Sequence, residues 1–315
     1  MGEETLKRKT GVARLSVVSN TLLVCFKLVV GLLTGSVSIL SEALHSAVDL
    51  IAAAIALFAV KKAGEPEDEH HRFGHGKFEN ISGFIEALLI FVAALWIIYE
   101  AISKLLHPEA LQAIGWGVTV MVISALANTL VSSMLFKVAK ETDSIALQAD
   151  GWHLRTDVWT SAGVAVGLGV MMIGEKFAPP TTNLHWIDPV AALVVALLIL
   201  KAAWKLTRQS LKDLLDTSLD EEEVGWIEEY LRQLPDGACG YHHLRTRKAG
   251  PVRFIELHLL VKPEMTVEAS HELADELVAA IKRQFDRARV LIHVEPCKVP
   301  KKDSRAGNKA ADGED

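Results

Sequence analysis

Two pairs of metal-binding side chains with the same spacing lie in apolar parts of the sequence. The first pair is His45 and Asp49, in the segment HSAVD, and the second is His153 and Asp157, in HLRTD. Residues four apart on a helix share one face, with Cβ atoms about 5–6 Å apart, so each pair can offer two ligands to one ion. A tetrahedral zinc site needs four ligands, which two such helices could supply. The pattern predicts an intramembrane site that passes a divalent metal ion.

A hydrogen-bonded polar patch is the alternative interpretation of a single His–Asp pair, and it is the usual one for a soluble helix. Here both pairs lie inside apolar runs. An unpaired charge in lipid costs roughly 2.5–3.5 kcal/mol per residue on insertion scales. This cost favours metal binding as the reason for both pairs.

The composition predicts apolar spans in one part of the chain and a charged domain in another. The chain has 315 residues, of which 50% are hydrophobic and 23% charged, a mixture that favours such segregation. Its net charge of −6 argues against a nucleic-acid partner.

The cysteines Cys25, Cys239 and Cys297 show no CxxC spacing, so we expect them to be reduced. No small-residue cleavage site follows the first apolar run, which predicts a retained span and not a signal peptide.

Six apolar runs are long enough, at about 20 residues, to cross a membrane. They cover residues 12–34, 36–60, 79–106, 113–138, 146–174 and 186–209. Polar residues within the runs are expected to face the bundle interior; they are Asn20, Glu86, Asn128 and Asp157. Lys and Arg gather at the N-terminus, in the second and fourth loops and after the last run. This bias predicts that both termini are cytoplasmic.

The region after Lys212 has the pattern of a small α+β domain. A helix is expected at 219–234, strands at 243–247 and 252–261, a helix at 267–285 and a strand at 289–294. The order αββαβ predicts an open sandwich with helices on one side of the sheet. We therefore expect a cytoplasmic N-terminus (1–11), a bundle of six transmembrane helices (12–212), a cytoplasmic metal-binding domain (213–298) and a disordered tail (299–315).

Two further clusters of metal-capable residues lie outside the spans. The loop between the second and third runs contains Asp68, His70, His71 and His75. The C-terminal domain contains His242, His243, His258, His271, His293 and Glu295. Histidines and carboxylates of this kind can bind zinc, whereas the alternatives are a solvated polar loop and ordinary surface histidines.

Four stretches of the sequence resemble the cation diffusion facilitator family, and within it the bacterial zinc and iron efflux type. They are GSVSILSEALHSAVD (35–49), HRFGHGKFE (71–79), ADGWHLRTDV (149–158) and LRTRKAGPVRFIELH (244–258). The resemblance covers nearly the whole chain except the tail. It implies a homodimer in the membrane, with a cytoplasmic domain of metallochaperone-like fold, that exports divalent metal in exchange for protons.

The resemblance also assigns roles to residues of this chain. It implies a transport site of His45, Asp49, His153 and Asp157 and a loop site of Asp68, His71 and His75. It further implies a dimer-interface site for a metal pair, made by His242, His258, His271, His293 and Glu295. Lys77 and Asp216 resemble a charge interlock near the membrane surface.

Two positions depart from the family pattern. His45 stands where bacterial relatives often have Asp, and it resembles zinc transporters that discriminate against cadmium. An imidazole-rich site also suits zinc better than the hard oxygen sites that manganese prefers. Glu295 stands where the family has Asp, and its extra methylene changes the geometry available for bridging two metals.

The function predicted from the sequence is a Zn²⁺/H⁺ antiporter of the cell inner membrane that is not an enzyme, with zinc as both transported and regulatory ion. Zinc needs neutral imidazole and free His titrates near 6.5, so metal and protons can exchange. Without a GxxxxGK[ST] loop, transport is expected to be gradient-driven. The alternatives are an Fe²⁺, Cd²⁺ or Mn²⁺ exporter and a metal-gated channel or sensor, although conduction needs weak binding. An intramembrane zinc hydrolase would need a motif such as HExxH, which is missing from the sequence.

Overall fold

The computed structural model describes residues 3–107, 116–177 and 186–297. The chain divides into two compact units. Unit 1 comprises Met1–Thr217 and Arg247–Val252, and unit 2 comprises Ser218–Thr246 and Arg253–Asp315. The tail expected at 299–315 lies outside the described residues.

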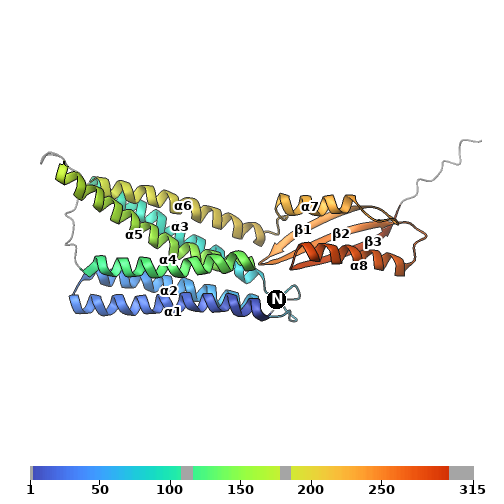
Figure 1. Cartoon of the computed structure of the whole chain (residues 1–315), viewed down its shortest axis with the longest axis horizontal. Helices are drawn as coiled ribbons and strands as arrows, with labels where there is room; N and C mark the ends of the chain where they lie inside the picture. Colours follow the sequence, from blue (N-terminus) through green and yellow to red (C-terminus); the bar gives the residue numbers. More distant parts are fainter. Residues whose placement is uncertain (1–2, 108–115, 178–185, 298–315) are drawn as a thin grey trace, which may run out of the picture. The chain divides into compact units, whose positions relative to one another are not determined.

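The helices of unit 1 confirm the predicted six-helix bundle (Figure 1). Their bounds are α1 Glu3–Thr34, α2 Val37–Ala63, α3 Lys77–Leu106, α4 Trp116–Thr142, α5 Ile145–Phe177 and α6 Ile187–Leu214. The described parts of α1, α2, α3, α4 and α6 are each long and apolar enough to cross a membrane. α5 carries Asp150, His153 and Asp157, and two of these are predicted metal ligands.

Polar groups line the inside of the bundle and apolar groups cover its outside. The buried residues of α1 recur every three or four positions and include Lys9, Ser16, Asn20 and Lys27, whereas Leu33 is 82% exposed. This arrangement is expected where lipid surrounds the helices, because polar side chains in a membrane turn toward the interior. The prediction that Asn20, Glu86 and Asn128 face inward is confirmed, since all three are buried.

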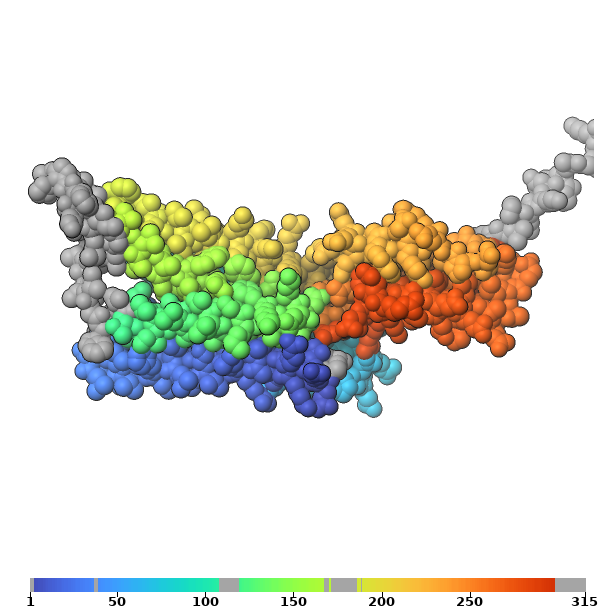
Figure 2. Space-filling model, in the orientation of Figure 1, coloured from blue at the N-terminus to red at the C-terminus, as the bar shows by residue number. Residues whose placement is uncertain are grey.

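Close contacts between pairs of helices fix the positions of the helices that carry the polar residues. α3 packs along α6, α1 along α2, and α4 along α5. The space-filling view shows α1, in blue, lying against α4, in green (Figure 2). At Gly163 of α5 an added Cβ would lie 2.6 Å from a methyl carbon of Val195 on α6, so this crossing needs glycine. Small residues allow such close approach between membrane helices.

Unit 2 has the predicted order αββαβ. Its elements are α7 Glu221–Arg232, β1 Ala238–Ala249, β2 Val252–Val261, α8 Val267–Gln284 and β3 Ala288–Pro296. The strand order is β1-β2-β3, and β2 pairs with β3 in parallel. Alternate residues of β2, such as Ile255 and Leu257, pack against Ile227 of α7 and Leu277 of α8. The intervening residues of β2 therefore face away from this core.

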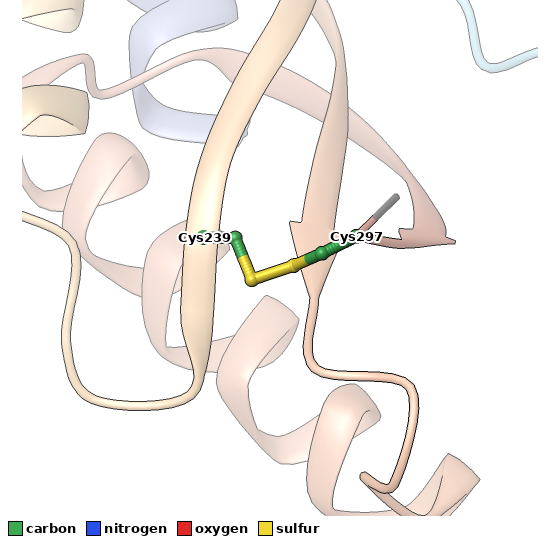
Figure 3. Close-up of a disulfide and its surroundings, with 2 residues drawn as sticks. All are labelled: Cys239 and Cys297. Atoms are coloured by element: carbon green, nitrogen blue, oxygen red, sulfur yellow. A yellow bond between two sulfur atoms is a disulfide. The ribbon is translucent and has the colours of Figure 1, made fainter. Parts of the chain in front are cut away.

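A disulfide joins Cys239 to Cys297, so the prediction of reduced cysteines is wrong for these two (Figure 3). Their Cα atoms are 6.3 Å apart although 58 positions separate them in sequence. Cys239 lies at the start of β1 and Cys297 directly follows β3. Both ends meet at the end of β2, where the backbone N–H of Cys297 donates to the carbonyl of Val261. Strand pairing thus brings together two cysteines whose spacing gives no sign of a partnership. Cys25 is free.

Candidate metal centres

The structure brings together the two His–Asp pairs of α2 and α5. Nε2 of His153 lies 2.9 Å from Oδ1 of Asp49, and Nε2 of His45 lies 3.8 Å from Oδ1 of Asp157. One ligand atom each of His45, Asp49 and Asp157 fall within 4.8 Å of one another. Each contact joins α2 to α5, so the ligands of one ion would come from both helices.

A fifth side chain orients this cluster, which we call the transport cluster (His45, Asp49, His153 and Asp157). Nδ2 of Asn128 on α4 donates a hydrogen bond to Oδ2 of Asp157, at 3.4 Å. Hydrogen bonds of this kind from neighbouring residues hold metal ligands in place. The sequence marks Asn128 only as a polar residue in an apolar run, and its contact with Asp157 follows from the packing of α4 on α5.

Burial differs within the transport cluster. Asp49 is 4% exposed and His153 is 6% exposed, whereas the side chain of His45 is 54% exposed. Nδ1 of His153 is buried and has no hydrogen-bond partner among the described residues. The nearby buried cation Lys27 contacts Glu42 at 3.1 Å and Ser46 at 2.8 Å. Among the described residues, the carboxylates of the cluster pair with histidines and not with Lys or Arg.

The loop between α2 and α3 gathers Asp68, His71 and His75. Nδ1 of His71 lies 3.1 Å from Oδ1 of Asp68, and Nε2 of His75 lies 3.2 Å from Oδ2. The two imidazole rings have centroids 4.3 Å apart. The side chain of His75 is fully buried, and neither of its ring nitrogens has a properly oriented hydrogen-bond partner among the described residues. Two ring nitrogens that converge on one carboxylate are suited to a shared cation.

The loop holds Asp68 in its ionised form. Desolvation raises the pKa of this carboxyl group, but hydrogen bonds from the backbone N–H groups of His71 and His70 and from the His71 ring outweigh it and lower the pKa to about 2. These N–H groups lie 2.6 Å and 2.9 Å from Oδ1 of Asp68. A carboxylate that stays charged at neutral pH is a ready metal ligand.

In unit 2, β2 and β3 place their metal-capable side chains on the face opposite the core. Residue His258 of β2 is in register with His293 of β3, and Leu260 is in register with Glu295. Oε1 of Glu295 lies 2.8 Å from Nδ1 of His258 and 3.5 Å from Nε2 of His293. Oε2 of the same carboxylate lies 3.1 Å from Nε2 of His242 on β1. Glu295 is therefore the centre of this cluster.

A break in the alternation of β1 adds His243 to the same cluster. Tyr241 and Leu244, which flank the His242–His243 pair, both pack against the core. Residues on one face of a regular strand are two positions apart, whereas these two are three apart. His243 has a φ of +53°, which is uncommon for a residue other than glycine. Its ring centroid lies 4.5 Å from that of His242 and 5.1 Å from that of His258. One extra residue in a strand produces this effect.

The remaining predicted ligand of unit 2, His271, lies on α8 and forms no part of the Glu295 cluster. Its Nε2 atom is 3.5 Å from Asp275, one turn along the same helix, and its side chain is 75% exposed.

The histidines of the cluster keep Glu295 ionised. Hydrogen bonds, first with His242 and then with His258, lower the pKa of Glu295 against a smaller desolvation effect. Glu295 is thus ionised and surrounded by three imidazoles, a donor set of the kind that binds zinc.

The predicted contact between Lys77 and Asp216 is present. Nζ of Lys77, the first residue of α3, lies 2.9 Å from Oδ1 of Asp216, which follows α6. The hydrogen bond from Lys77, helped by the charge of Arg247, lowers the pKa of Asp216 against partial desolvation. The pair joins the ends of α3 and α6 in unit 1.

Comparison with known proteins identifies both parts of the chain. Residues 13–215 match the family model described as the cation efflux transmembrane domain, and residues 219–297 match the cation efflux protein cytoplasmic domain. The uncharacterized transporter sll1263 of Synechocystis sp. is 37% identical over 85% of this chain and 84% of its own length. The cation-efflux pump FieF of Klebsiella pneumoniae is 35% identical over 84% of this chain and 85% of its own.

A solved chain of CzrB is 41% identical, and the match covers 25% of this chain and 98% of that one, with a TM-score of 0.25. Together, the two family models extend over both units described above. The chain is accordingly a multi-pass membrane protein that belongs to the cation diffusion facilitator family of divalent cation efflux transporters, and it is not an enzyme.

Proposed function

We propose that this protein exports Zn²⁺ from the cytoplasm in exchange for protons. The observation that carries the proposal is the transport cluster, in which His45 and Asp49 of α2 meet His153 and Asp157 of α5. Two imidazole nitrogens and two carboxylates are a four-ligand set that suits zinc. A buried ion can exchange sides of the membrane when α2 and α5 move relative to their neighbours.

The choice of zinc rests on the ligand types. Imidazole suits zinc, copper and iron, whereas oxygen-only sites suit manganese and magnesium. With His45 in place of a carboxylate, half of the donors in the cluster are nitrogen. An exporter of Fe²⁺, Cd²⁺ or Mn²⁺ with the same fold is the alternative that the experiment below addresses.

Proton exchange follows from the protonation requirement of the ligands. Imidazole binds metal only in its neutral form, so metal binding releases protons and protonation releases metal. Ordinary His titrates near pH 6.5, so a difference in pH between the two sides of a cell membrane can change its protonation. In the proposed cycle, zinc loads from the cytoplasmic side, and protons entering from the other side displace it.

The proposed assembly is a homodimer in the inner membrane with both termini in the cytoplasm. The asymmetric distribution of Lys and Arg supports this orientation, as does the description of the model that matches residues 219–297 as a cytoplasmic domain. Binding of regulatory zinc by His242, His258, His293 and Glu295, with His271 at the dimer interface, would stabilise the dimer. The loop site of Asp68, His71 and His75 is proposed as an additional zinc site, and Lys77 and Asp216 as the coupling contact.

Metal uptake into proteoliposomes with an imposed pH gradient tests the proposal. Zn²⁺, Cd²⁺, Fe²⁺ and Mn²⁺ are compared for the wild type and for His45→Asp. We expect gradient-driven uptake that favours zinc, with cadmium admitted only by His45→Asp. Zinc uptake at the same rate with and without the pH gradient would indicate a channel and refute the exchanger. Preference for iron or manganese would refute the assignment of zinc.

A further inference from the structure

Two buried carboxylates in the bundle lie outside the transport cluster, and neither forms an ion pair with a Lys or Arg among the described residues. Glu86 on α3 and Asp150 on α5 are both 0% exposed. Among the described residues, Oε2 of Glu86 has no hydrogen-bond partner, and the carboxyl group of Asp150 has only a loose contact with the hydroxyl of Ser16. The two side chains lie within electrostatic reach of one another.

Another buried carboxylate in the same bundle, that of Glu79, has a positively charged partner. Glu79, two turns before Glu86 on α3, pairs with the buried Lys9 of α1 and accepts a hydrogen bond from Ser144. In the described part of the chain, the side-chain partner of Glu86 is Ser82, whose hydroxyl donates to Oε1 at 3.3 Å. The charged form of a buried carboxyl group is strongly disfavoured without a counter-charge, and two adjacent carboxylates disfavour it further. Full burial of both groups without a Lys or Arg partner therefore favours a proton held by the Glu86–Asp150 pair.

The position of the pair connects the transport cluster to one end of the bundle. Asp150 precedes His153 on α5 by three residues, about 4.5 Å along the helix axis, and it interacts electrostatically with His153 and Asp49. Glu86, Ser82 and Glu79 lie on one face of α3 because they are spaced by four and three residues. This face runs to the first turn of α3, which begins at Lys77, at the end of the bundle that is proposed to be cytoplasmic.

The groups that surround the pair come from each neighbouring helix. α1 contributes Ser16 and Asn20, both buried and polar but uncharged. α6 contributes the uncharged Ser210, whose hydroxyl lies close to Gly83 of α3. The charged or titratable neighbours are Asp49 of α2 and His153 of α5. Among the groups named, His153 and Asp49 of the transport cluster are the ones that can exchange a proton with Asp150. Glu86 can then accept a proton from Asp150.

We propose that Glu86 and Asp150 form a proton-carrying pair that links the transport cluster to the cytoplasmic end of the bundle. When the emptied cluster faces the cytoplasm, a proton that leaves it passes to the pair, and the pair releases one proton toward Ser82 and Glu79. Its own proton content is unchanged after each passage. The proposal rests on the proposed proton-coupled function and adds the route by which protons leave.

The test replaces the titratable group without changing its shape. In proteoliposomes that report both internal pH and internal zinc, we expect Glu86→Gln to lower gradient-driven zinc and proton fluxes together by on the order of 10²-fold, the lower end of what a positioned proton-transfer group contributes. Equilibrium zinc binding to the same protein should stay within about twofold, and Glu86→Asp should restore most of the flux. Glu100→Gln is the matched control, because Glu100 is on the same helix but is 53% exposed and paired with Lys104.

Each outcome separates this proposal from the proposed function. If the wild type shows no flux driven by the pH gradient, the exchanger itself is refuted. If the wild type is gradient-driven and Glu86→Gln behaves like it, only the proton-carrying pair is refuted. Loss of zinc binding in Glu86→Gln, or failure of Glu86→Asp to restore flux, would show a structural role and also refute the pair. Asp150→Asn should reproduce the Glu86→Gln result.

Discussion

Nε2 of His153 and Oδ1 of Asp49 are 2.9 Å apart across two helices, although 104 positions separate them in the sequence. The contact unites the two motifs that share a His–x–x–x–Asp spacing. Each motif can offer only two ligands, and the packing of α2 on α5 joins them. The site thus depends on how closely these two helices approach, which makes it sensitive to any movement between them.

The orienting role of Asn128 predicts a loss of affinity without a loss of ligands. Asn128→Ala removes the hydrogen bond to Asp157, and loss of such an outer partner costs about 10–100-fold in metal affinity. Equilibrium dialysis with zinc measures the effect in purified protein. Thr129→Ala is the control, because the Thr129 hydroxyl donates its hydrogen bond to the Ala125 carbonyl of its own helix. Equal affinities for the two variants would exclude an orienting role.

The contact between Lys77 and Asp216 predicts a small coupling that disappears in acid. Both side chains are more than one third exposed, at 38% and 49%, so we expect a coupling free energy of about 0.2–1 kcal/mol at neutral pH. The fold lowers the pKa of Asp216, so its contribution is present above the unfolded pKa and is lost as pH falls through the folded pKa.

A double-mutant cycle of Lys77→Met and Asp216→Asn, followed by thermal unfolding in detergent, measures this coupling at pH 7 and in acid. Asn is used because residue 216 has a φ of +54°, which Asn tolerates better than most residues. A coupling that keeps its size after acid has protonated the carboxylate would contradict an ion pair.

The depressed pKa of Asp68 predicts which group releases metal from the loop. With a pKa of about 2, Asp68 stays ionised throughout mild acidification, so its contribution is lost only as pH falls through that value. Zinc bound by Asp68, His71 and His75 should therefore be released by protonation of the imidazoles, at a pH above that at which Asp68 is protonated. Dialysis across pH 4–8 checks this in a protein carrying Asp157→Ala and His258→Ala, which disable the other clusters. Zinc that stays bound down to pH 4 would contradict release through the imidazoles.

The sequence predicted the elements well because each carries a strong local signal. Five of the helices in unit 1 are long apolar segments, and β2 begins and ends where its apolar pattern does, at Val252–Val261. The His–Asp pairs were found for the same reason, since their spacing matches one helical turn. Local patterns of this kind do not depend on how distant segments pack.

Features that depend on distant packing were missed or wrongly predicted. The Cys239–Cys297 disulfide exists because the ends of β1, β2 and β3 meet, which spacing alone does not reveal. His243 lies beside the Glu295 cluster because β1 departs from its alternation at a left-handed residue. Asn128 and Asp150 gain their positions from helix packing, and their only sequence signal is a polar residue in an apolar run.

Zinc flux through two aspartate variants tests the central claim most directly. Asp49→Ala and Asp157→Ala each remove one ligand of the transport cluster, and Asp236→Ala, in an exposed position, is the control. We predict that gradient-driven flux falls by more than about 100-fold in both cluster variants, because losing a ligand should exceed the 10–100-fold cost of losing an outer partner, while the control keeps wild-type flux. Normal zinc flux in both Asp49→Ala and Asp157→Ala would contradict the assignment of the transport site.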